Sequence, residues 1–142
     1  MRSVQLVLLL LLVTSAATAE INNERALFNY QMLCQGCHTE NGRGFRSVPK
    51  IDGTIGHFLR SQQGREYLVR VPGSANAYLS DTELAEVLNW MIVRFAGNSK
   101  PNNWQKYSAG EVSQYRAQPL LEVETYRQIL VENLRLETEE AW

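Results

Sequence analysis

The stretch Cys34-Gln35-Gly36-Cys37-His38 is the most informative part of this sequence. The chain has 142 residues and only two cysteines, and both stand in this stretch, two residues apart. The histidine that follows them is one of only two histidines in the chain. Three side chains that can bond to a metal or a cofactor are thus concentrated in five consecutive residues, and we expect the chemistry of the protein to be centred there.

The order Cys-x-x-Cys-His is the attachment signature of haem c. Two cysteines in a secreted chain could otherwise form a disulfide, a redox dithiol or part of a zinc site. A redox dithiol of the thioredoxin kind needs a βαβ context, which is absent, and a structural zinc site needs four suitably spaced ligands. The motif therefore predicts one covalent haem c, with thioether bonds to Cys34 and Cys37 and with His38 as the proximal axial iron ligand.

The first residues predict secretion. Arg2 provides a positive start, residues 6–13 form an almost unbroken apolar run, and Ala17-Thr18-Ala19 matches a signal-peptidase site. The apolar run is shorter than the roughly 20 residues that span a bilayer. We expect a signal peptide over residues 1–19, no membrane span after its cleavage, and a periplasmic location, since maturation of haem c after export suits a bacterial periplasm.

Helix signals dominate the rest of the chain, so the expected fold class is all-α. Asn22 and Asn23 are good caps for a first helix that delivers the haem motif at its end. The run from Ser80 to Glu83 is a capping box for an amphipathic helix that ends at Gly97. Between these helices, residues 39–56 indicate a wrapping loop, residues 57–63 a short helix and residues 72–73 a turn.

Beyond residue 97 lies a segment with two further helix signals. Ser108 and Glu111 repeat the capping-box pattern, and Pro119 suits the first turn of a last helix. That last helix carries an apolar stripe, which must be buried either against the rest of the chain or against another subunit. We expect a cytochrome-like domain over residues 20–97 and a helical C-terminal extension over residues 98–142.

The motif and its surroundings resemble a class I cytochrome c over about residues 22–97. The resemblance is carried by Asn29-Tyr30 before the motif, by Gly42-Arg43-Gly44 and Val48-Pro49 after it, and by the helix of residues 79–95. It implies that the first and closing helices cross while loops enclose one covalent haem. It also implies that the Pro49 carbonyl accepts a hydrogen bond from His38, and that Tyr30, Trp90 and Phe95 belong to the core.

One feature departs from that family. A class I cytochrome c supplies a methionine to the far side of the iron, yet no methionine stands between His38 and Trp90. Three alternatives remain for the sixth coordination position: Met91, His57 or no protein ligand. Met91 is equally explained as core packing, and His57 as a surface or propionate-contacting residue. Met32 precedes Cys34 on the same helix and is excluded.

The net charge of −1 gives no indication of nucleic-acid binding, but charge is unevenly distributed. Basic residues prevail between positions 41 and 80 and acidic residues beyond position 107. The basic side chains could neutralise the haem propionates or guide an acidic redox partner. They are Arg43, Arg46, Lys50, Arg60, Arg65 and Arg70.

These features predict a periplasmic monohaem cytochrome that transfers single electrons, with a dehydrogenase and a terminal acceptor as redox partners. Two alternatives remain open. The chain could be a haem subunit held in a larger dehydrogenase by its extension, or an open-site haem protein that binds a small ligand. No Ser/His/Asp, Walker or Rossmann signature indicates another enzyme class.

Overall fold

The computed structural model describes residues 21–138, so the predicted signal peptide lies outside the described residues. Within this range the chain is helical and contains no β-strand, which confirms the predicted all-α fold class. No helix of residues 21–138 combines the length and the apolar character that crossing a membrane requires. The helices are α1 (Asn23–Leu33), α2 (Gln35–His38), the 3₁₀ helix η1 (Ile55–Arg60), α3 (Gln62–Arg70), α4 (Pro72–Ala75), α5 (Asp81–Phe95), the 3₁₀ helix η2 (Gly97–Ser99), α6 (Ala109–Arg116) and α7 (Val123–Thr138).

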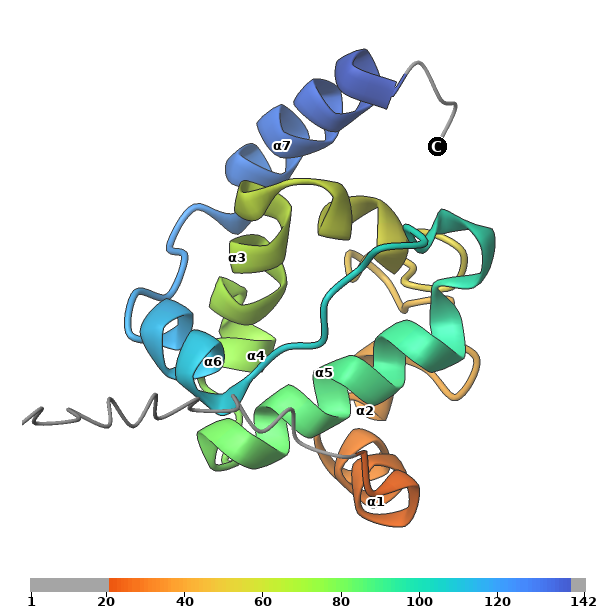
Figure 1. Cartoon of the computed structure of the whole chain (residues 1–142), viewed down its shortest axis with the longest axis vertical. Helices are drawn as coiled ribbons and strands as arrows, with labels where there is room; N and C mark the ends of the chain where they lie inside the picture. Colours follow the sequence, from red (N-terminus) through yellow and green to blue (C-terminus); the bar gives the residue numbers. More distant parts are fainter. Residues whose placement is uncertain (1–20, 139–142) are drawn as a thin grey trace, which may run out of the picture.

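Helices α1 and α5 cross and pack together at one end of the molecule (Figure 1). The predicted capping box begins α5: Ser80 Oγ accepts from the backbone N–H of Glu83 (3.3 Å), and the Glu83 carboxylate accepts from that of Ser80 (2.9 Å). At the crossing, the ring of Tyr30 lies 5.3 Å from that of Trp90 and 5.3 Å from that of Phe95. The three aromatic residues expected in the core therefore form one cluster there.

A buried carboxylate adds a polar link between the same two helices. Glu86 of α5 is only 1% exposed, and it accepts hydrogen bonds from the backbone N–H of Asn22 (2.8 Å) and from Arg25 Nε (2.7 Å). Asn22 also caps α1, because its Oδ1 accepts from the backbone N–H of Arg25 (3.0 Å). The start of α1 is thus fixed to α5 by hydrogen bonds to a charged group, which are stronger than neutral ones.

The middle of the chain contains more helix than the sequence predicted. The helix expected over residues 57–63 is divided at Ser61, whose hydroxyl caps the longer α3 by accepting from the backbone N–H of Gly64 (3.0 Å). Gly64 packs directly against the backbone of Phe58, where any side chain would collide. Pro72, expected in a turn, instead occupies the first position of α4, where its missing N–H has no cost.

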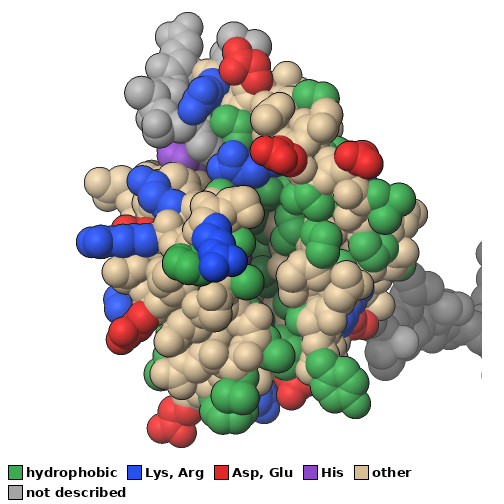
Figure 2. Space-filling model, turned by 180° about the vertical axis from the view of Figure 1, so that it is seen from behind, with side chains coloured by type: hydrophobic (Ala, Val, Ile, Leu, Met, Phe, Trp, Pro, Cys, Tyr) green, Lys and Arg blue, Asp and Glu red, His purple; other side chains and the backbone are tan. Residues whose placement is uncertain are grey.

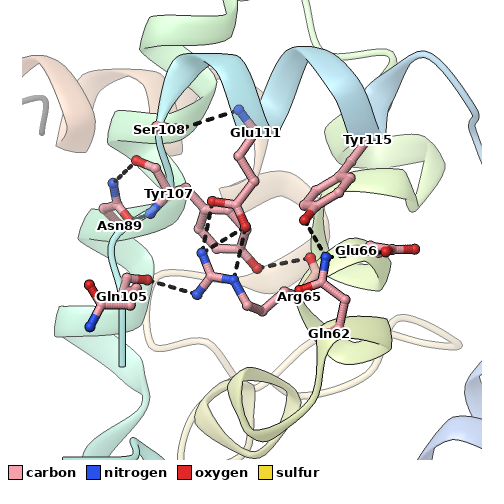
Figure 3. Close-up of polar contacts among 9 residues, drawn as sticks. All are labelled: Gln62, Arg65, Glu66, Asn89, Gln105, Tyr107, Ser108, Glu111 and Tyr115. Carbon is pink, nitrogen blue, oxygen red and sulfur yellow. Dashed lines mark hydrogen bonds and ion pairs between the residues drawn. The ribbon is translucent and has the colours of Figure 1, made fainter. Parts of the chain in front are cut away.

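The C-terminal extension packs on α3 and α5 through α6 (Figure 1). Ser108 caps α6 as expected, but the Glu111 carboxylate does not return to it. That carboxylate instead accepts two hydrogen bonds from Arg65, each 2.9 Å long, because a bidentate guanidinium is a stronger partner than a backbone N–H (Figure 3).

The last helix, α7, begins at Val123 and not at Pro119 as expected. The reason is a tether in the connecting segment: the backbone N–H of Leu120 donates to the carbonyl of Arg70 (2.9 Å), and Arg70 Nε donates to the carbonyl of Gln118 (2.8 Å). Leu120 is buried by this arrangement. The tether holds the connecting segment along the end of α3 and delays the start of α7.

Candidate haem-binding cavity

The three residues of the haem motif lie close together at the junction of α1 and α2, with Cys34 between the helices and with Cys37 and His38 in the single turn of α2. Cys34 ends α1 and precedes α2, and its carbonyl accepts from the backbone N–H groups of Cys37 (3.1 Å) and His38 (2.9 Å). The two cysteines are not joined by a disulfide. All three side chains line one cavity, so the turn directs both sulfurs and the imidazole to the same space.

This cavity has a volume of about 310 Å³, within the range of pockets that hold small molecules and cofactors. Its lining is mostly apolar and comes from α1, α2, η1, α3, α4, α5, α7 and the loop after the motif. The apolar lining includes Leu33, Val48, Ile51, Ile55, Phe58, Leu68, Val71, Leu84, Val87, Leu88 and Val123. Figure 2 shows a hollow lined by hydrophobic side chains, with Lys and Arg side chains gathered beside it.

His38 is half-buried at the cavity, and its Nδ1 atom is fully buried. Burial lowers the pKa of its imidazole, while the nearby Pro49 carbonyl raises that pKa by a smaller amount. The contact with Pro49 is not a hydrogen bond of standard geometry, because His38 Nδ1 is buried without a partner among the described residues. The Pro49 carbonyl thus faces the imidazole, as the family resemblance implied, and the hydrogen bond itself stays a prediction.

Gly44 allows the loop after the motif to fold back toward His38. Its φ of +77° lies in the left-handed region, and a Cβ at this position would lie 2.9 Å from the Pro49 carbonyl oxygen. Its backbone N–H donates to the His38 carbonyl (3.2 Å). The Gly42-Arg43-Gly44 segment therefore serves a steric purpose, since only glycine lets Pro49 approach the motif this closely.

The two sulfurs differ in their surroundings. Burial, and secondarily the charge of Cys37, raises the pKa of the Cys34 thiol to about 11. Cys37 is exposed at the edge of the cavity. One thiol is thus held against the apolar interior while the other is accessible from outside.

The candidates for the sixth coordination position are placed differently. Met91 of α5 lines the cavity and is 6% exposed, in contact with the hydrophobic core. His57 is buried within η1 but does not line the cavity. Met32 is 65% exposed on α1 and does not line the cavity either. Of the two side chains proposed as sixth ligands, only Met91 therefore reaches the cavity.

Among the polar residues of the cavity, Arg127 and Tyr67 were not singled out from the sequence. Arg127 reaches the cavity from α7, and its Nε is buried without a hydrogen-bond partner in the described part of the chain. Tyr67 of α3 is 5% exposed and also lines the cavity; burial raises the pKa of its phenol, and the charge of Arg127 opposes that rise. The sequence could have indicated Arg127, because it stands four residues after Val123 and so lies on the same face of the last helix as the apolar stripe.

The basic residues singled out from the sequence do not form one group. Arg65 is bound to Glu111 and to the Gln105 carbonyl (2.7 Å), inside the contact between α3 and α6. Arg70 is bound to the linker before α7. Lys50 is exposed and lines the cavity. Of these three, only Lys50 is placed to meet a group bound in the cavity.

Comparisons with known proteins agree with this geometry. The chain is 31% identical over 122 residues to cytochrome c-552 of Thermus thermophilus, a match that covers 72% of this chain and 90% of that protein. It is also 31% identical over 122 residues to a second cytochrome c-552 from a strain of the same species, covering 72% of this chain and 80% of that protein. No family model matches the chain. The matched share exceeds residues 22–97, so the similarity is not confined to them.

Proposed function

The chain belongs to the c-type cytochromes, proteins with covalently bound haem c, and on this basis we propose that it transfers single electrons between redox proteins. The observation that carries the proposal is the cavity of about 310 Å³ into which Cys34, Cys37 and His38 all project. Bound haem iron supplies a one-electron redox couple. The protein contributes attachment, orientation and an environment that excludes water.

Cys34, Cys37 and His38 are the residues that we assign to cofactor binding. The two sulfurs are placed to form the thioether bonds, and the imidazole is placed to donate its Nε2 to the iron as the proximal ligand. An imidazole ligand needs its other nitrogen oriented by an acceptor. Pro49 is the carbonyl nearest to that role, and the unpartnered Nδ1 of His38 supports the assignment.

Two polar side chains of the cavity, Arg127 and Tyr67, fit the carboxylates of a haem. Arg127 carries a permanent positive charge with an unpaired Nε, and Tyr67 stands beside it with its phenol inside the cavity lining. A buried carboxylate is strongly destabilised unless it has such partners. We assign Arg127 and Tyr67 to propionate binding. The apolar walls keep water from the site and favour the iron state of lower charge.

The location and the partners are part of the same proposal. Residues 1–19 are proposed to export the chain to the periplasm, with residues 20–97 as the cytochrome domain and residues 98–142 as its extension. The partners are proposed to be a dehydrogenase and a terminal acceptor that contact the exposed edge of the cavity. Cys37, Leu33 and Lys50 are exposed there, so a partner meets an apolar surface with a nearby cation.

The proposal is tested by expressing the full chain with a haem c maturation system in the periplasm of a bacterium. We expect haem that stays with the protein on a denaturing gel, together with reversible one-electron oxidation in voltammetry. Cys37→Ala should reduce the covalent attachment to one thioether, visible as a shift of the pyridine haemochrome band. Met32→Leu is the control on the exposed face of α1 and should leave all three readouts unchanged.

Two outcomes would contradict the proposal. The first is a protein without covalent haem although a known cytochrome c matures in the same cells. The second is a covalent haem that cannot be reduced and reoxidised at an electrode. Processing is read separately, because the mass of the purified protein shows whether cleavage follows Ala19.

A further inference from the structure

The wall of the cavity formed by residues 71–79 brings no side chain of a haem-ligand type into the cavity. Its sequence is Val-Pro-Gly-Ser-Ala-Asn-Ala-Tyr-Leu, without histidine, methionine, lysine or cysteine. The cavity is lined from this segment by Val71, Gly73, Ser74 and Ala77. Asn76 and Tyr78 face solvent, and the Tyr78 side chain is 98% exposed.

His38 and residues 71–79 line the same cavity from different elements. The motif helix α2 packs mainly on α1, whereas α4 packs on α3 and α6. Both α2 and α4 nevertheless line the same cavity, so the space between them separates the two walls. A ligand for the sixth coordination position would have to come from a wall of the cavity other than the one that carries His38, and residues 71–79 form such a wall.

The same wall is fixed from behind by one side chain of the C-terminal extension. Arg116, the last residue of α6, donates from Nη1 to the Leu79 carbonyl (2.8 Å) and from Nη2 to the Ala77 carbonyl (2.8 Å). Its Nε and Nη2 donate to the Ala75 carbonyl (3.2 and 3.1 Å), and Nη1 forms an ion pair with Asp81 (3.1 Å). All three guanidinium nitrogens are used, so Arg116 holds the wall at several points.

We propose that residues 71–79 cover the sixth coordination position of the haem iron without supplying a ligand, and that Arg116 is the positioning residue that keeps this cover closed. The iron is then accessible to a small neutral molecule such as carbon monoxide, and entry is limited by the opening of the wall. The inference rests on the proposed function, because it requires a haem bound to Cys34, Cys37 and His38.

The two alternative ligands stand elsewhere in the chain. Met91 lines the cavity from α5, a helix that packs on both α1 and α6. Its side chain is also part of the hydrophobic core. His57 does not line the cavity. Neither residue belongs to the wall of residues 71–79.

The test is carbon monoxide binding to the ferrous holoprotein, followed by stopped-flow absorbance. We expect the wild type to bind carbon monoxide at the native iron, without the need to remove Met91 by a Met91→Leu substitution. Arg116→Ala should raise the association rate by about tenfold, because each hydrogen bond from a charged group stabilises the closed wall by at least that factor. Arg116→Lys, which keeps the charge but contacts fewer carbonyls, should fall between them.

Arg65→Ala is the matched control. Arg65 is also an arginine that joins the extension to the rest of the chain, through Glu111, but it makes no hydrogen bond to residues 71–79. Its loss should leave the association rate within about twofold of the wild type, since a general loosening of α6 does not release the wall. Equal acceleration in the Arg65→Ala and Arg116→Ala proteins would overturn the role of Arg116.

The ligand part of the inference has its own refutation. A ferrous wild type that stays low-spin and does not bind carbon monoxide has a protein ligand at the sixth position, and the inference is then wrong. If Arg116→Ala yields no holoprotein, the wild type and Arg116→Lys still decide the question. A chain without covalent haem refutes the proposed function instead, and the haem-stained denaturing gel separates that result from the others.

Discussion

Replacing Asn89 with alanine should strongly destabilise the protein, because this residue joins α5 to the segment that leads into α6 (Figure 3). The Asn89 side chain is 0% exposed. Its Nδ2 donates to the Tyr107 carbonyl (2.9 Å), and its Oδ1 accepts from the Tyr107 backbone N–H (2.7 Å). Both backbone groups of Tyr107 lie in the interior and depend on this one amide.

The magnitude follows from what the truncation leaves behind. Alanine leaves a buried N–H and a buried carbonyl unpaired, and each costs about 1–3 kcal/mol, so we expect a loss of about 3 kcal/mol in the free energy of unfolding. This is a large share of the roughly 5–15 kcal/mol that stabilises a typical domain. With an m-value of about 2 kcal/mol/M, the urea midpoint should fall by about 1.5 M.

The assay is urea unfolding of the holoprotein, followed by far-UV circular dichroism. Asn103→Ala is the control: this asparagine lies in the same linker with an exposed side chain, and its loss should change the stability by less than about 0.5 kcal/mol. Tyr107→Phe removes only the bond from the phenol to the Arg65 carbonyl (2.9 Å) and should cost about 1 kcal/mol. A midpoint for Asn89→Ala that equals the Asn103→Ala midpoint would refute the reasoning.

Three further predictions concern single residues. The hydrogen bond from Arg25 lowers the pKa of Glu86 below the ordinary 4.5. The ionised carboxylate therefore stabilises the protein above pH 4.5, and this contribution is lost as the pH falls through the lowered pKa. In thermal unfolding between pH 7 and about pH 3, the melting temperature of the wild type should therefore fall more steeply than that of Glu86→Gln. Gly44→Ala should reduce the yield of holoprotein, measured by haem absorbance. Gly53→Ala is the control: Gly53 has a φ of +70° but no atom near its Cβ position, so alanine should cost only the roughly 1–2 kcal/mol of a left-handed backbone. Arg127→Ala should lower the midpoint potential in protein voltammetry by about 60 mV, which corresponds to a tenfold change in a one-electron equilibrium; an unchanged potential would remove Arg127 from the propionate assignment.

The elements that the sequence predicted best are those whose signals are local. The capping box at Ser80 requires only residues within one turn of helix, and the structure contains both of its hydrogen bonds. The spacing of Cys34, Cys37 and His38 is likewise local, so their common direction into one cavity followed from the motif. The all-α fold class rests on such signals and on the family resemblance.

The elements that were missed depend on contacts between distant parts of the chain. Glu111 looked like half of a capping box, but Arg65, 46 residues away, binds its carboxylate. Pro119 looked like the start of a helix, but the hydrogen bond from Leu120 to Arg70 keeps that segment out of α7. Periodicity cannot reveal such competition, because the competing partner is set by tertiary packing.

The same long-range contacts connect the C-terminal extension to the chemistry of the cavity. Arg127 of α7 supplies a cation to the cavity, and Arg116 of α6 holds the wall of residues 71–79. Residues 71–79 are too few to form a hydrophobic core of their own, so contacts from other parts of the chain must hold them in position. The extension provides that support through Arg116, whose guanidinium group donates to the carbonyls of the alternate residues Ala75, Ala77 and Leu79. Deletion of the extension should therefore change both the access of small molecules to the iron and the free energy of unfolding.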